Sequence, residues 1–98
     1  MYLKTHWKIS FIDFIKKVSP VAEFNSLEGK SYRVIAIKGS KMKFIRKETG
    51  KEWSMDLRGV YQAFKELKSF KTADFEPYVP FTHSLALGLL LHVGLLKR

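Results

Sequence analysis

Residues 32–57 contain three stretches with the pattern of β-strands, and the turns between them are too short for a crossover. The first stretch, 32–38 (YRVIAIK), is rich in β-branched residues and is followed by the two-residue turn Gly39-Ser40. The second stretch, 41–47, ends in a four-residue turn that contains a glycine, and the third stretch completes the segment. Because parallel strands need a long crossover connection, these three strands can only form an antiparallel meander.

The alternation of side chains also predicts which face of the sheet each residue occupies. Met42 and Phe44 share one phase of the second strand. Lys41, Lys43 and Lys47 share the other phase. Successive side chains of a strand point to opposite faces, and the third strand alternates in the same way. We therefore expect a sheet with one buried face and one charged face.

Three further segments have the pattern of helices. The first, 10–18, begins with a serine and an aspartate at capping-box spacing and ends before a proline. The second, 57–70, has an apolar stripe at helical spacing, and Asp56 is its expected N-cap. The third begins near His83, and we expect Gly94 to be the C′ residue that ends it.

The expected fold is therefore α+β, a three-stranded antiparallel meander with helices packed on one face, in the order α-β-β-β-α-α. Residues 21–30 are expected to be a connector that tucks Phe24 and Leu27 into the core. The chain 1–98 has the length of one domain, and 46% of its residues are hydrophobic, which is enough for a core. We expect a single small basic domain.

The positive charge of the chain is concentrated in one short segment. The net charge is +9, and residues 38–51 supply five of these charges, because they contain six cations and one acid. A row of cations along a strand matches the charge spacing of a phosphate backbone. Arg33, in the first strand, adds a guanidinium that can bind phosphate in a bidentate manner. The candidate nucleic-acid-binding residues are Arg33, Lys38, Lys41, Lys43, Arg46, Lys47 and Lys51.

A second interpretation starts from the leucine-rich segment 83–96, which has almost no polar face. A helix that is apolar all round is buried all round, either at the centre of its own fold or against another chain. In the latter case the protein is an interaction or structural subunit that forms a homodimer or binds a protein partner, with Leu87 and Leu91 at the interface. The lysines then only keep the surface soluble, since edge lysines suppress aggregation.

Other classes of function find little support in the sequence. The absence of cysteine excludes disulfides and thiol catalysis, and it favours a reducing compartment, so we expect a cytoplasmic protein. The apolar run 85–96 is shorter than the roughly 20 residues of a membrane span, so no membrane association is expected. Three dispersed histidines predict no metal site, and no cofactor is expected. The protein is expected not to be an enzyme, with a small nuclease-like activity as the remaining alternative.

Two resemblances point in the same direction as the charge. The order α-β-β-β-α resembles the double-stranded-RNA-binding fold and the small RNase toxins built on it. The run 44–53 (FIRKETGKEW), followed by an amphipathic helix, resembles plant-type DNA-binding domains made of three strands and a helix. Both resemblances imply nucleic-acid binding. The chain departs from the RNA-binding pattern at the start of the helix after the strands, where only Arg58 stands in for the expected basic cluster. The sequence leaves open whether DNA or RNA is bound.

Overall fold

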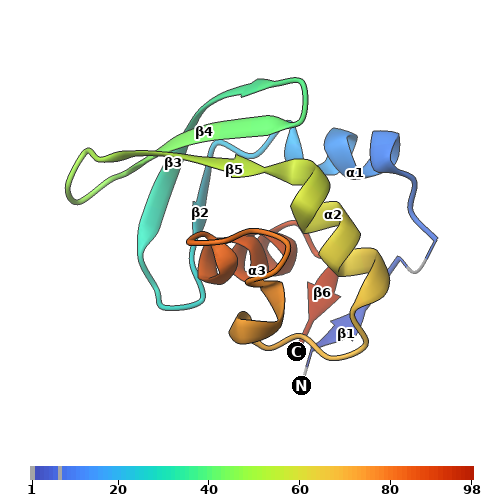
Figure 1. Ribbon diagram of the computed structural model, residues 1–98. Helices are drawn as coiled ribbons and strands as arrows, with labels where there is room; N and C mark the ends of the chain where they lie inside the picture. Colours follow the sequence, from blue (N-terminus) through green and yellow to red (C-terminus); the bar gives the residue numbers. More distant parts are fainter. Residues whose placement is uncertain (1, 7) are drawn as a thin grey trace.

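A computed structural model describes residues 2–6 and 8–98 and shows an α+β fold (Figure 1). Its elements, in chain order, are β1 (Leu3–Lys4), α1 (Phe11–Val18), β2 (Glu23–Asn25), β3 (Ser31–Lys38), β4 (Lys41–Arg46), β5 (Glu52–Asp56), α2 (Leu57–Glu66), the 3₁₀ turn η1 (Thr72–Phe75), α3 (His83–His92) and β6 (Leu96–Lys97).

The main sheet has four antiparallel strands in the order β2-β3-β4-β5. The meander β3-β4-β5 forms as predicted, but the expectation of three strands is wrong, because the connector 21–30 contributes β2. Phe24 of β2 pairs with Tyr32 of β3, and the two rings stack with their centroids 5.8 Å apart. A strand of three residues is too short to show an alternating pattern, which is why the sequence did not reveal it.

A second, two-stranded sheet joins segments from opposite ends of the chain. β1 pairs antiparallel with β6, with Leu3 opposite Lys97 and Lys4 opposite Leu96. Figure 1 shows this pair beside α2, close to both chain ends. The predicted element order lacked β1 and β6, because two-residue strands carry no periodic signal in the sequence.

The predicted helix starts are confirmed by their capping contacts. Ser10 Oγ accepts a hydrogen bond from the backbone N–H of Asp13, at 3.1 Å, and so caps α1. Asp56 is both the last residue of β5 and the N-cap of α2, where its carboxylate accepts from the N–H of Arg58 at 2.9 Å. The strand therefore passes directly into the helix, and Leu57 N–H also donates to the Ser40 carbonyl in the β3–β4 turn, at 2.7 Å.

The second helix is shorter than predicted. It ends at Glu66 instead of residue 70, because Leu67 has an extended backbone with φ −74° and ψ 142°. The chain then turns Phe70 back into the core, where its ring lies 6.4 Å from Phe64 and 6.0 Å from Phe75. An apolar residue at helical spacing was thus buried by a turn and not by a continued helix.

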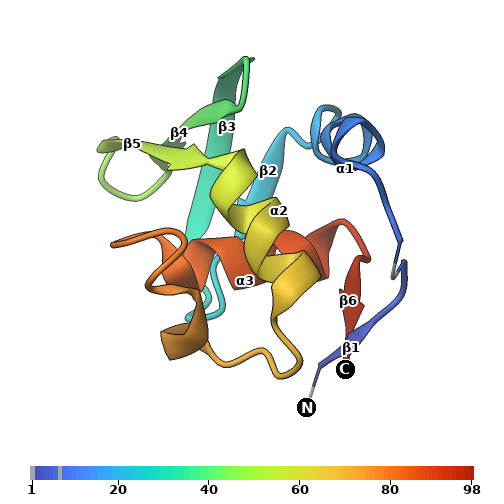
Figure 2. The ribbon, with the colours of Figure 1, turned by 45° about the vertical axis from the view of Figure 1, so that its right-hand side comes forward.

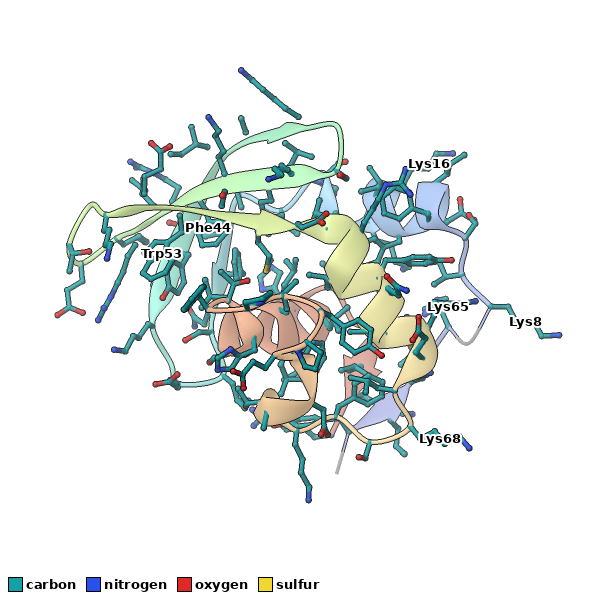
Figure 3. All side chains as sticks on the ribbon, in the orientation of Figure 1. Lys8, Lys16, Phe44, Trp53, Lys65 and Lys68 are labelled. Atoms are coloured by element: carbon teal, nitrogen blue, oxygen red, sulfur yellow. The ribbon has the colours of Figure 1, made fainter. Side chains whose placement is uncertain are left out.

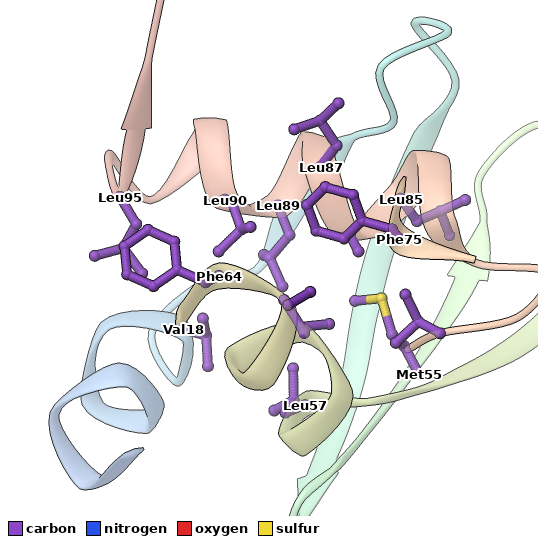
Figure 4. Packing of buried hydrophobic residues seen from close by; sticks show 14 of the residues in the cluster. Val18, Met55, Leu57, Phe64, Phe75, Leu85, Leu87, Leu89, Leu90 and Leu95 are labelled. Carbon is purple, nitrogen blue, oxygen red and sulfur yellow. The ribbon is translucent and has the colours of Figure 1, made fainter. Parts of the chain in front are cut away.

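Helix α3 is the centre of the core. Figures 1 and 2 show α2 and α3 on the same side of the four-stranded sheet. Leu87, Leu89 and Leu90 are fully buried, and Figure 4 shows Leu89 and Leu90 directed toward α2. At Gly88 the helix packs so closely on the turn after β2 that a Cβ atom would collide with the Asn25 carbonyl oxygen. Of the two positions considered for this helix, the central one is therefore observed.

The end of α3 confirms the predicted glycine cap. Gly94 has φ +79°, and its N–H donates to the Leu91 carbonyl at 3.2 Å. Leu95 N–H donates to the Leu90 carbonyl at 3.0 Å, and the Leu95 side chain is fully buried. These two bonds and the apolar contact make up a Schellman motif, which requires a left-handed residue that glycine adopts without steric cost.

Candidate nucleic-acid interface

Strand β4 separates its lysines from its apolar side chains as predicted. Met42 and Phe44 are fully buried on the inner face of the sheet, which α2 and α3 cover. Lys41 and Lys43 are exposed on the opposite side, here called the outer face. The burial of the two apolar anchors fixes the direction of the lysines between them, because neighbouring side chains of a strand point to opposite faces.

The register places the cations of β3 and β4 side by side on the outer face. Lys41 lies opposite Lys38 of β3, and Lys43 lies opposite Ala36. Arg33, which is also exposed, shares this face at the other end of β3, opposite Ile45. Residues two apart along a strand are about 7 Å apart, and paired strands about 4.8 Å. The exposed cations of these two strands form what we call the cationic strip, Arg33, Lys38, Lys41 and Lys43.

Acidic residues border the cationic strip on both sides. Asp56 of β5 pairs with Lys41, and Glu52 of β5 pairs with Ile45. On the other side, Glu23 of β2 pairs with Arg33. Ser54, which is uncharged, is the neighbour of Lys43 in β5. The strip is thus two strands wide, and neither strand neighbour of Lys43, Ala36 or Ser54, carries a charge.

Lys47 belongs to the outer face but is already paired. Its ammonium lies 2.7 Å from a carboxylate oxygen of Glu23, and both side chains are about half exposed. The hydrogen bond and charge of Lys47 lower the pKa of Glu23 from its ordinary value, and the Arg33 charge adds to this effect. The prediction that Lys47 shares a face with Lys41 and Lys43 is confirmed, but Glu23 offsets its charge.

Arg46, which was predicted as a binding residue together with the lysines, is not part of the outer face. It follows Phe44 by two residues and therefore has the inner phase, opposite Tyr32. Its guanidinium bonds to Glu48 at 3.3 Å, and only 24% of its side chain is exposed. Its neighbour across the ladder, Tyr32, is 4% exposed, and burial raises the pKa of its phenol.

Lys51 is also separated from the cationic strip. It lies in the β4–β5 turn, and its ammonium stands over the ring of Trp53, 4.8 Å from the ring centroid. Trp53 is half-buried against the core, on the inner side of the sheet. The seven predicted cations therefore divide into the four of the strip, the paired Lys47 and two on the inner side of the sheet.

Lysines that were not among the predicted binding residues lie near α1 and α2. Figure 3 labels Lys8, Lys16, Lys65 and Lys68, which lie on or beside α1 and α2, away from the outer ends of β4 and β5. Among them, Lys65 stands over the ring of Tyr61 at 6.0 Å from its centroid. None of these was singled out from the sequence, because they are spread among acids and apolar residues.

The predicted interface residues of α3 differ in their availability. Leu87 is fully buried within its own chain, so it cannot contribute to a surface. Leu91 is half-buried and lines a cavity of about 410 Å³ beside His92 and residues 23–27. Apart from His83 at its start, the helix is accessible to a partner only in its last turn.

Searches for other kinds of site and for related proteins gave no match. Within residues 2–6 and 8–98, no three His, Cys, Asp or Glu side chains gather as metal ligands would. The part of the chain that the structure describes contains no helix with both the length and the apolar character of a membrane span. Comparison with protein-family models, curated proteins and solved structures found no match to this chain.

Proposed function

We propose that this protein binds nucleic acid, and that the cationic strip contacts the phosphate backbone. The observation that supports this is the exposure of Lys41 and Lys43 on one side of β4 while Met42 and Phe44 are fully buried. Among the described residues, neither lysine has an acidic group within ion-pairing distance. Cations spaced at about 7 Å along a strand can meet successive phosphates of a polyanion.

The chemistry of the strip favours contacts to phosphate over contacts to bases. Three of its four members are lysines, which act as point charges, and phosphate contacts position a nucleic acid without reading its sequence. The acids on both sides of the strip would repel a second phosphate chain. We therefore expect one backbone to bind at a time, with little sequence preference and a steep dependence on salt. Four phosphate contacts would give a salt slope of about −3 to −4.

The test is a salt-titrated binding measurement with labelled DNA and RNA oligonucleotides of mixed sequence. The double variant Lys41→Glu, Lys43→Glu should weaken binding by about a hundredfold and flatten the salt dependence. The matched control is Lys65→Glu, Lys68→Glu, which changes the net charge by the same amount on the far side of the molecule and should change affinity much less. Equal losses in both variants, or no salt-dependent binding of the unmodified protein, would refute the proposal.

A subunit that dimerises through α3 is the alternative function, and it has less support. The apolar part of the helix that a partner could reach is limited to Leu91 and the cap residue Val93, because the preceding leucines are buried within the chain. Such a patch is small compared with the roughly 800 Å² per partner of a stable interface. Size-exclusion chromatography over a range of concentrations tests this alternative with the same sample.

A further inference from the structure

Half of β3 has a neighbouring strand on only one side. β3 has eight residues and β2 has three, and their pairing covers only residues 31–33 of β3. One more bond continues this ladder, from Val34 N–H to the Ala22 carbonyl at 2.8 Å. Before Ala22 the chain turns toward α1, because Val21 N–H donates back to the Val18 carbonyl and Pro20 has no N–H. The segment 35–38 thus forms an open edge within the sheet, and a register shift between Val34 and Ala36 makes its first part irregular.

A groove runs along this open edge. It has a volume of about 600 Å³ and lies between residues 34–37 of β3 on one side and residues 19–22 with Ile15 of α1 on the other. An added strand of five residues would be about 16 Å long and would occupy the line that β2 leaves. The groove therefore has the position that an additional strand would need.

The open edge is apolar, unlike the edge at the other side of the sheet. Ile35 is 52% exposed, and Val34 and Ile37 are half-buried. Ile12 of α1 is 68% exposed and lies one helical turn before Ile15 of the groove wall. In contrast, β5 carries Glu52 and Asp56, the kind of charge that protects natural edges from pairing.

The charges around the groove identify its occupant. Arg33 and Lys38, both exposed, bracket the apolar segment, and Lys16 lies on the exposed side of α1, three residues before Ser19 of the groove wall. A second copy of the chain would be disfavoured, because antiparallel pairing of segment 34–37 with itself sets Arg33 opposite Lys38 twice. Like charges directly opposite each other destabilise a strand pair.

We propose that the open edge of β3 binds an extended acidic segment of another protein by strand addition. Backbone hydrogen bonds to segment 35–38 would hold the acidic segment, its apolar side chains would pack on Ile35 and Ile37, and its carboxylates would meet Arg33 and Lys38. This proposal does not rest on nucleic-acid binding, but because Arg33 and Lys38 also belong to the cationic strip, the two ligands would compete for them.

The experiment uses the full chain without nucleic acid and a fluorescein-labelled seven-residue peptide of alternating Glu and Val, followed by anisotropy. A second peptide, in which Lys replaces every Glu, should bind about tenfold more weakly than the Glu–Val peptide, because its charge is reversed. Two N-methylated isomers of the Glu–Val peptide test for strand pairing. Methylation of the amides that face β3 should weaken binding about tenfold or more, whereas methylation of the alternate amides should leave affinity unchanged.

Two variants test the site. Lys38→Glu should weaken the binding of the Glu–Val peptide and strengthen the binding of the Lys–Val peptide. Lys68→Glu makes the same change in net charge and should alter the binding of neither peptide. Ile35→Gln keeps the net charge but removes the apolar contact, so it should weaken the binding of both peptides. Equal binding of the two N-methylated isomers would show charge attraction without pairing and would overturn the proposal. Absence of binding, or a dimer that occupies the edge, would do the same. None of these three outcomes bears on oligonucleotide binding, so the two proposals fail separately.

Discussion

Helix α3 and the ribbon formed by β3 and β4 are the two most unusual stretches of this sequence, and folding treats them in opposite ways. Four of the five leucines of α3 are buried by the rest of the same chain, and three of them, Leu87, Leu89 and Leu90, are fully buried. The cations of the ribbon are mostly exposed, but acids from β2 and from the β4–β5 turn reach two of them. The apolar composition of α3 therefore predicted that the helix is buried. The number of cations in the ribbon did not predict which of them are free of acidic partners.

The reason is that burial of a leucine needs no particular partner, whereas neutralisation of a lysine needs an acid at one place. A leucine gains from any apolar neighbour, so a helix made of leucines is buried wherever the fold offers enough surface. The available charge of a lysine depends on which acid lies within about 4 Å, and that acid can be distant in the sequence, as Glu23 is from Lys47. The following predictions test this contrast, from the largest expected effect to the smallest.

The largest effect is expected from truncation of the buried helix. Leu87→Ala should lower the free energy of unfolding by about 2–5 kcal/mol, because it leaves a cavity in the core. Leu91→Ala should cost clearly less, since Leu91 is half-buried at the accessible end of the helix. Urea denaturation of the two variants measures the difference. Similar losses in both variants would contradict a central position for α3.

The next effect concerns Lys43, in the middle of β4, and Lys47, which directly follows the strand. Lys43→Gln should reduce the salt slope of oligonucleotide binding by about one and weaken affinity several-fold, because one phosphate contact is lost. Lys47→Gln should leave the slope unchanged, since the Lys47 ammonium is held by Glu23. Gel shifts at several salt concentrations distinguish the two variants. A slope reduced equally by Lys47→Gln would mean that phosphate displaces Glu23.

A smaller gain of binding is expected when the paired lysine is released. Glu23→Gln removes the carboxylate that bonds to Lys47 and lies beside Arg33. Both cations then become available, so affinity for oligonucleotide should rise about two- to threefold, with a steeper salt slope. Glu28→Gln is a matched control with the same change in charge on the turn after β2. If both variants gain equally, only the net charge matters.

The smallest effect is a shift in titration. The Lys47 hydrogen bond lowers the pKa of Glu23, so the carboxylate is held in its charged form in the folded protein. Its contribution to stability is present above the ordinary pKa of an unfolded glutamate and is lost as pH falls through the lowered, folded value. In an NMR titration, Lys47→Met should return the pKa of Glu23 toward its ordinary value. An unchanged value in this variant would assign the shift to another group.

The parts of the fold that local patterns specify were predictable. The caps at Ser10 and Asp56, the alternation of β4 and the glycine end of α3 each depend on residues within a few positions of one another. β2, β1 and β6 have two or three residues each and exist only because distant partners lie beside them. Short strands of this kind leave no periodic signal, so sequence alone did not locate them.

The candidate site was predictable in part for the same reason. Phase along β4 assigned Lys41, Lys43 and Lys47 to one face, and the structure agrees. The same phase assigns Arg46 to the inner face, so its inclusion in the binding surface treated nearness in sequence as nearness in space. The pairing of Lys47 depends on Glu23, and the segment that contains Glu23 was not expected to be a strand.

The direct passage from β5 into α2 at Asp56 has a consequence for the ribbon. No flexible residue separates the strand from the helix, and Leu57 N–H is tied to the β3–β4 turn. The ribbon is therefore connected rigidly to the helical core. A polyanion that binds the ribbon contacts a surface that is already ordered in the free protein. Binding should therefore not carry the entropic cost of ordering the backbone, which weakens recognition by mobile loops.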